Sequence, residues 1–197
     1  MMWVGLGNPG RTHSKNRHNI GFMAIDKIKE IYEFKNWKNK FSCKINNGII
    51  SNKKITLVKP QNFMNNSGYS INMAKNFFST PSDDIFVFYD EIDLEIGKLR
   101  VKFGGGNNGH NGLKNIDEKI SNNYWKVKIG IGRPIRKSQV TKWVLADFTK
   151  KDEEDWLNKF LLIIANQSHY LVKKDINNFM ESLSFMDITL GREDIQT

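Results

Sequence analysis

Four histidines are the side chains of this 197-residue sequence best suited to exchanging a proton with water near neutral pH, namely His13, His18, His110 and His169. His18 lies in Arg17-His18-Asn19, between a polar stretch and a predicted helix, where solvent and substrate can both reach it. A structural role as a capping residue accounts for that position equally well. His169 lies within a predicted C-terminal helix and is interpreted as a surface or packing residue.

Carboxylates that could orient a histidine follow the apolar segment 85–89, in the sequence Asp90-Glu91-Ile92-Asp93. A histidine that acts as a general base needs an acceptor that fixes its tautomer. Ligand sites in α/β folds lie at the carboxyl ends of strands, which is where these acidic residues are expected. An acidic turn is also ordinary protein surface, so this segment by itself does not establish a site.

Three asparagines lie in Gly- or Pro-containing turns between predicted strands and helices: Asn8, Asn65 and Asn111. Neutral amides can hydrogen-bond a carbonyl group or a developing oxyanion without adding charge. Asparagine is abundant in this sequence, so each of these turns could instead be purely structural.

Covalent and metal-dependent chemistry find little support in the sequence. Ser67 lacks the flanking glycines of a nucleophile elbow, and Cys43 lies in a predicted strand without a neighbouring histidine. No His-x-x-x-His or Cys-x-x-Cys spacing indicates a zinc site. The remaining chemistry is the activation of water by a histidine, with no metal and no cofactor.

The spacing of apolar residues predicts an α/β fold, with a single domain over residues 1–197 and a twisted mixed β-sheet flanked by α-helices. Short apolar runs predict strands at 2–6, 45–50, 55–58 and 85–89, the last of them central in the sheet. Helical spacing predicts helices that begin near Asn19, around 71–78, at 112–121 and after Thr149, where acidic residues form a capped first turn.

Two further segments, 99–103 and 125–129, alternate strictly between apolar and basic residues. Side chains two apart share one face of a strand, so the pattern predicts that four basic side chains point away from the core: Arg100, Lys102, Lys126 and Lys128. The net charge of +9, from 30 Lys and Arg against 21 Asp and Glu, favours a polyanionic partner. Nucleic acid is favoured over membrane because no amphipathic anchor is visible.

Composition predicts a cytoplasmic location. One cysteine excludes an internal disulfide and fits a reducing compartment. No apolar run approaches the roughly 18 residues of a membrane helix, and the N-terminus lacks the regions of a signal peptide.

The segment Gly5-Leu6-Gly7-Asn8-Pro9-Gly10 matches the G-x-G-x-x-G pattern of dinucleotide-binding turns. Such a site needs a helix that starts inside the motif, but Pro9 removes a donor and residues 11–17 delay the helix. The acidic residue expected about 20 positions on lies within a helical pattern instead of at the end of a strand. A nicotinamide or flavin site is therefore disfavoured, and the similar segment 104–109 is interpreted as a flexible turn.

Six short motifs are distributed along nearly the whole chain: Val4-Gly-Leu-Gly-Asn-Pro-Gly10, Arg17-His-Asn-Ile-Gly-Phe22, Lys59-Pro-Gln-Asn-Phe-Met-Asn-Asn-Ser-Gly68, Asp90-Glu-Ile-Asp93, Gly104-Gly-Gly…Gly109-His-Asn-Gly-Leu113 and Ile129-Gly-Ile-Gly-Arg-Pro134. Their order and spacing resemble the bacterial peptidyl-tRNA hydrolase family. No single segment is decisive, but six in register are specific.

The resemblance implies a monomeric cytoplasmic esterase that cleaves the bond between tRNA and a prematurely released peptide. The family's general base matches His18, and the carboxylate that orients it matches Asp90. The family's amides, which hold the peptide and the attacking water, match Asn8, Asn65 and Asn111. The resemblance further implies Met64 and His110 in the substrate pocket, and a clamp for the 5′-phosphate of tRNA made by Lys102 and Lys128.

The chain departs from the family pattern at three positions. The family usually has Tyr where this chain has His13, and Thr where it has Asn16. His13 is predicted to contact the substrate near the end of the tRNA. Lys128 replaces a residue that is often Arg, which exchanges a bidentate fork for a point charge. The alternative is an RNA-binding protein of the same fold that has lost hydrolysis, although a pure binder has no need of a general base.

Overall fold

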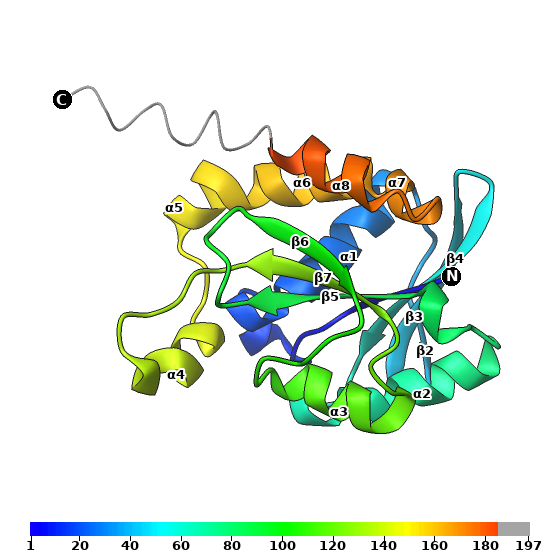
Figure 1. The fold of residues 1–197 in the computed structure, drawn as a ribbon, viewed down its shortest axis with the longest axis horizontal. Coiled ribbons are helices and arrows are strands. Elements are labelled where there is room, and N and C mark those ends of the chain that lie inside the picture. The colour runs from blue at the N-terminus through cyan, green and yellow to red at the C-terminus, as the bar shows by residue number, and fades with distance from the viewer. Residues whose placement is uncertain (185–197) are drawn as a thin grey trace.

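The sheet that organises the molecule has seven strands in the order β2-β3-β4-β1-β5-β7-β6, in a computed structural model that describes residues 1–184 (Figure 1). The central strands β1, β4, β5 and β7 run parallel, whereas β2, β3 and β6 pair antiparallel with their neighbours. The strands are β1 (Met2–Gly5), β2 (Lys38–Lys40), β3 (Cys43–Ile50), β4 (Lys53–Pro60), β5 (Ile85–Glu91), β6 (Leu99–Phe103) and β7 (Trp125–Gly130). The predicted α/β class, the mixed sheet and the central position of segment 85–89 are confirmed.

Helices cover both faces of the sheet (Figure 1). One face carries α1, α6, α7 and α8, and the other carries α2 and α3, while α4 lies apart, near the carboxyl ends of the parallel strands. The helices are α1 (Ile20–Ile31), α2 (Ser67–Phe77), α3 (Asn111–Ile120), α4 (Val140–Leu145), α5 (Lys150–Asp152), α6 (Asn158–Gln167), α7 (His169–Val172) and α8 (Ile176–Ser184).

Alternate residues of β5 enter two separate hydrophobic clusters. Phe86 and Phe88 are buried against α1 and the C-terminal helices, and Val87 and Tyr89 are buried against α2 and α3. A strand with both faces buried in this way reads as a continuous apolar run. The carboxyl end of this strand is therefore held from both sides, which fixes the position of the acidic residues that follow.

Gly21 allows α1 to start directly against the sheet. A Cβ atom at this position would lie 2.2 Å from the carbonyl oxygen of Phe88. The same close approach aligns Phe22, whose backbone N–H donates to the Leu6 carbonyl at 3.1 Å. The residues just before α1 are consequently brought to the ends of β1 and β5.

The capped start predicted after Thr149 is confirmed. The Thr149 hydroxyl accepts from the Asp152 backbone N–H at 3.0 Å, and the Asp152 carboxylate accepts from the Thr149 N–H at 2.8 Å. The helix that follows is not continuous, because a π-helical turn, Glu153–Leu157, joins α5 to α6. The predicted inner-face residues Phe160 and Ile164 are buried.

Lys126, which the strand pattern predicts to point away from the core, is nevertheless buried. Its side chain does lie on the face opposite Val127, but the loop of residues 104–110 covers it, and it is 1% exposed. The Lys126 Nζ donates to the carbonyl oxygens of Gly105 at 2.6 Å and Gly106 at 3.2 Å. Strand alternation gives the face of a side chain, whereas a loop that folds over that face decides its exposure.

Within the described residues, no helix combines the length and the apolar composition that crossing a membrane requires. The predicted single domain of residues 1–197 extends past this part of the chain. Residues 185–197 of that prediction lie outside the described residues.

Candidate active site

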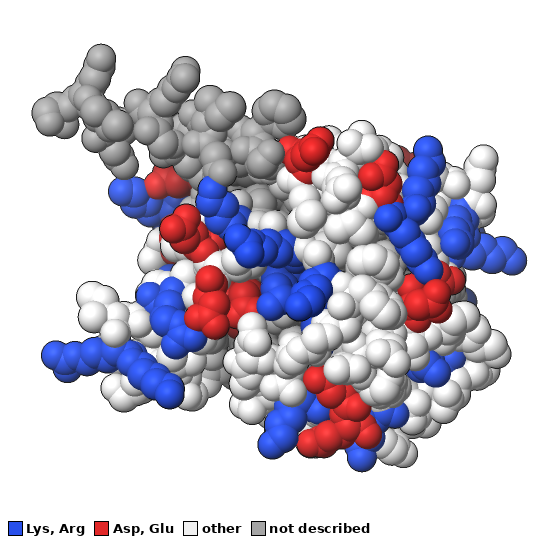
Figure 2. Space-filling model, viewed as in Figure 1, with Lys and Arg blue, Asp and Glu red and all other residues white. Residues whose placement is uncertain are grey.

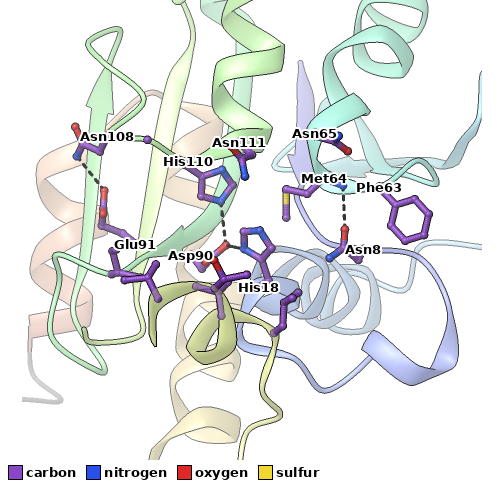
Figure 3. A pocket seen from close by; sticks show the side chains of 16 residues that line it. Asn8, His18, Phe63, Met64, Asn65, Asp90, Glu91, Asn108, His110 and Asn111 are labelled. Carbon is purple, nitrogen blue, oxygen red and sulfur yellow. Dashed lines mark hydrogen bonds and ion pairs between the residues drawn. The ribbon is translucent and has the colours of Figure 1, made fainter. Parts of the chain in front are cut away.

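A cavity of about 400 Å³ opens at the carboxyl ends of the parallel strands (Figure 3). The residues that line it come from the turn after β1, the turn before α1, the turn after β4, the end of β5, the start of α3, and α4. Seven of the predicted site residues line this cavity: Asn8, His18, Met64, Asn65, Asp90, His110 and Asn111. The predicted residues His13, Lys102 and Lys128 do not line it.

Asp90 accepts from two imidazole rings with the same oxygen atom. His18 Nδ1 lies 2.7 Å from Asp90 Oδ1, and His110 Nε2 lies 3.0 Å from it. An ionised carboxylate only accepts hydrogen bonds, so both ring nitrogens donate. In its neutral form His18 therefore carries its proton on Nδ1 and keeps a lone pair on Nε2, the nitrogen that a general base uses to take a proton from water.

The backbone of α3 fixes the tautomer of His110. His110 is the residue that caps α3, and its Nδ1 accepts from the Leu113 backbone N–H at 3.3 Å. A nitrogen that accepts carries no proton, so the proton of the neutral ring is on Nε2, where it is donated to Asp90. His110 thus binds Asp90 without offering a free basic nitrogen to the cavity.

The buried charge of Asp90 changes the titration of the site. Burial alone would raise the pKa of Asp90, but His18 and His110 outweigh it, and this pKa lies well below its usual range. Burial alone would lower the pKa of His18, but the charge and hydrogen bond of Asp90 outweigh it, and the pKa of His18 is raised above 6.5. The pair consists of a firmly ionised carboxylate and a strengthened base.

Asn8 is held rigidly by its neighbours. Its backbone N–H donates to Asn19 Oδ1 at 2.8 Å, and Asn19 Nδ2 donates back to the Asn8 carbonyl at 2.9 Å. The Asn8 side-chain Oδ1 accepts from the Met64 backbone N–H at 2.9 Å, which leaves the Nδ2 donor on the side that faces His18 (Figure 3). This amide is positioned to donate to an oxygen atom near the imidazole.

The amides of Asn65 and Asn111 lie at the mouth of the cavity and are exposed. Within residues 1–184 neither side chain makes a hydrogen bond, so both amides can bind a ligand. Between them Met64 is buried and supplies an apolar wall.

Sequence reasoning gave no role to Arg17, although the residue lies next to His18. Its buried guanidinium stacks 3.9 Å from the centre of the Trp143 ring and donates to the Asp147 carbonyl at 2.9 Å. These contacts fix the C-terminal end of α4, from which Val144 contributes to the cavity wall. The Arg-His-Asn motif was visible in the sequence, but its contact with a segment about 130 residues away was not.

His13 lies just outside the cavity, with its ring 6.4 Å from that of Phe63, which lines it. Its Nδ1 is 3.1 Å from the side-chain Oδ1 of Asn16, whose Nδ2 donates to Asp147 at 2.7 Å. Two of the positions that depart from the family pattern therefore contact each other.

Lys102 and Lys128 line a neighbouring cavity of about 610 Å³ instead. Lys102 is exposed, as predicted. Lys128 is mostly buried and forms an ion pair with Glu91 at 3.0 Å, a partner that sequence reasoning did not anticipate.

The nitrogens of His18 and His110 and the oxygen of Asp90 also form the group among the described residues that could hold a metal ion. Binding a metal here would displace the protons that both rings donate to Asp90. It would also move the His110 proton to Nδ1, which would deprive the Leu113 N–H of its acceptor. The donor set therefore fits its own hydrogen bonds better than a metal ion.

Two further features bear on the chemistry of the chain. Burial raises the pKa of the Cys43 thiol to about 12, so this cysteine is a poor nucleophile. Three other cavities, lined by Asp26, Lys128 and Lys38 among others, have no histidine in their linings.

Comparison with known proteins decides the family. The family model for peptidyl-tRNA hydrolase matches residues 2–190. The chain belongs to the peptidyl-tRNA hydrolase family. The peptidyl-tRNA hydrolase of Bartonella bacilliformis is 50% identical over 184 residues, covering 93% of this chain and 95% of that one. The enzyme of Bartonella henselae is 48% identical over 185 residues, with the same coverage.

The fold agrees with solved structures of peptidyl-tRNA hydrolases. The crystal structure of the enzyme from Acinetobacter baumannii superposes with a TM-score of 0.86 at 31% sequence identity, covering 92% of this chain and 93% of that one. The resemblance seen in the sequence motifs is thus confirmed at the level of the family and the fold.

Proposed function

We propose that this chain hydrolyses the ester bond that joins a peptide to the 3′-terminal ribose of tRNA, with His18 as the general base. The observation that carries the proposal is the pairing of His18 Nδ1 with Asp90, which leaves Nε2 of His18 free in a cavity lined by amides. Membership of the peptidyl-tRNA hydrolase family supports the choice of substrate.

The reaction begins when His18 Nε2 takes a proton from a water molecule, whose oxygen attacks the ester carbonyl carbon. The Asn8 Nδ2 group, together with the Asn111 amide, donates to the oxyanion of the tetrahedral intermediate. His18 then gives its proton to the ribose oxygen as the C–O bond breaks, which releases a free peptide carboxylate and tRNA. Asp90 stabilises the imidazolium in between and stays ionised.

The amides at the mouth of the cavity account for a preference for peptidyl-tRNA over ordinary aminoacyl-tRNA. Asn65 and Asn111 can donate to, and accept from, a peptide group. A free α-ammonium offers donors only, and it would have to leave water beside the apolar side chain of Met64. Asn65, Asn111 and Met64 therefore form the proposed peptide subsite, with His13 beside it behind Phe63.

Lys102 and Lys128 form the proposed clamp for the 5′-phosphate of tRNA. Both side chains line one cavity, together with Arg100. Phosphate contacts position a nucleic acid and carry no sequence information, so this clamp would accept many tRNAs. The proposal includes a metal-independent, cytoplasmic enzyme. It also includes action as a monomer, since one chain supplies every residue of the proposed site.

The decisive experiment measures hydrolysis of purified N-acetyl-aminoacyl-tRNA by the wild-type chain and by His18→Ala. Removing the base should lower kcat by about 10²- to 10⁴-fold, with binding of the tRNA retained. Near-normal turnover by His18→Ala would refute the proposed base. Wild-type protein that binds the tRNA without cleaving it would instead establish the RNA-binding alternative. Wild-type activity that is lost with a chelator and restored by zinc would overturn the metal-free mechanism.

A further inference from the structure

The two cavities share a boundary made of two side chains. Glu91 and Asn108 line both the cavity that contains His18 and the neighbouring cavity that contains Lys102 and Lys128. This pair therefore offers a direct link between the proposed phosphate clamp and the reacting ester.

Glu91 contacts the clamp and the glycine-rich loop with the same atom. Its Oε2 accepts from Lys128 Nζ at 3.0 Å and from Asn108 Nδ2 at 3.3 Å. Its Oε1 accepts from the Asp93 backbone N–H at 3.3 Å. The Glu91 side chain is only 5% exposed, and a carboxylate this deeply buried depends on its donors.

Asn108 connects this carboxylate to the reacting groups. It lies two residues before His110, in a left-handed backbone conformation with φ of 49°, and Figure 3 shows its side chain reaching Glu91. His110 donates to Asp90, and the adjacent Asn111 is one of the amides proposed to hold the substrate. The other end of the same loop is fixed by Lys126. The half that carries the reacting groups is held by the Asn108 contact together with a bond from Asn107 Nδ2 to Asp117 at 3.3 Å.

We propose that Glu91 is a positioning residue that couples phosphate binding at Lys128 to the placement of His110 and Asn111. A phosphate dianion attracts the Lys128 ammonium more strongly than a single carboxylate does. As Lys128 turns to the phosphate, Oε2 of Glu91 loses its charged partner and holds Asn108 more tightly, because a buried carboxylate must keep a donor. The loop is then drawn against the end of β5, where His110 and Asn111 are needed.

The consequence is that the 5′-phosphate raises the rate of the chemical step as well as the affinity. When the tRNA lacks this phosphate, Lys128 stays paired with Glu91, and Oε2 of Glu91 continues to accept from both Lys128 and Asn108. The coupling rests on the proposed function, since it assigns a further role to the clamp within that reaction.

The test compares N-acetyl-aminoacyl-tRNA that carries a 5′-phosphate with the same tRNA after removal of that phosphate. In the wild-type chain, kcat should be about fivefold higher with the phosphate, and KM lower. In Glu91→Gln and in Asn108→Gly the kcat ratio should fall to about one, while the KM ratio persists because Lys102 and Lys128 remain. Glycine suits the left-handed backbone at position 108. Glu118→Gln, which removes an equal charge from the exposed face of α3, should behave like the wild type.

Two results would overturn the coupling: equal wild-type kcat values for the two tRNAs, or a wild-type kcat ratio retained in Glu91→Gln. A Glu91→Gln protein that is merely damaged in its fold would lose kcat with both tRNAs by the same factor, retain the ratio, and count against the coupling. Wild-type protein that cleaves neither tRNA would refute the proposed function and the coupling with it. Cleavage of both at equal kcat would refute the coupling alone.

Discussion

A single carboxylate oxygen, Oδ1 of Asp90, accepts hydrogen bonds from both His18 and His110. The two donors keep Asp90 ionised despite its burial, and Asp90 in turn stabilises the protonated form of His18. A raised pKa makes His18 a stronger base towards water, but it also leaves less of the neutral form at low pH. The proposed catalytic pair therefore sets a lower pH limit for its own activity.

The acid limit can be measured through kcat/KM as a function of pH. The base must be neutral, so activity should rise with pH through the raised pKa of His18, at a midpoint above 6.5. Asp90→Asn removes the charge that raises this pKa, so the midpoint should move to lower pH while kcat falls by about 10²- to 10⁴-fold. A midpoint that stays in place in Asp90→Asn would show that another group controls the profile.

At the scale of elements, the approach of α1 to the sheet positions His18, the proposed general base. Gly21→Ala would place a methyl group 2.2 Å from the Phe88 carbonyl oxygen, so α1 would have to move. The free energy of unfolding should fall by about 3 kcal/mol, as measured by urea denaturation, with a loss of kcat because His18 moves with the helix. Gly106→Ala, where no atom lies within 4 Å of the added Cβ, should stay within about 0.5 kcal/mol of the wild type. Equal stability of the two variants would contradict this packing.

The attachment of α4 to the turn before His18 is a second feature at this scale. Arg17→Lys keeps the charge but loses the planar group that stacks on Trp143 and donates to the Asp147 carbonyl. The free energy of unfolding should fall by about 1–3 kcal/mol, and KM should rise because Val144 no longer closes the cavity. Arg11→Lys, at an exposed position nearby, is the matched control and should leave both quantities unchanged. Unchanged KM in Arg17→Lys would mean that α4 is held by other contacts.

At the scale of the whole molecule, the net charge of +9 is unevenly spread. On the face seen in Figure 2, Lys and Arg side chains gather over β6 and β7, where Arg100, Lys102 and Lys128 line one cavity. Acidic side chains lie directly beside them, so the surface is a local basic patch beside negative charge. Such a patch is expected to bind a polyanion in one orientation and not to bind polyanions non-specifically over the whole surface.

The patch should govern the salt dependence of tRNA binding. Lys102→Ala should raise KM for full-length peptidyl-tRNA by roughly tenfold, about 1.4 kcal/mol, and reduce the slope of log KM against log salt by about one. A short N-acyl-aminoacyl ester without the tRNA body should be cleaved as by the wild type. Lys54→Ala, which removes an exposed lysine from β4, should change neither value. An equal effect of Lys102→Ala on the short ester would argue against a phosphate contact.

The order of elements and the location of the site follow from local patterns in the sequence. Apolar runs and helical spacing place β1, β5, α1 and α3 within a few residues of their observed bounds, because each element is stabilised largely by its own periodic face. The position of Asp90 at the end of a buried strand and of His18 before a helix was readable for the same reason. The resemblance to the family motifs added the expectation that Asp90 orients His18.

Other features of the site could be seen only in the tertiary structure, because they depend on contacts between segments far apart in the sequence. Strand alternation placed Lys126 on the correct face, but only the folded loop over it shows that the side chain is buried. The convergence of His110 on Asp90, the contact of Arg17 with α4 and the junction of Lys128 with Asn108 at Glu91 likewise join residues at least 17 positions apart. Periodicity records which side of an element is apolar, whereas the partner across a cavity is set by how whole elements pack.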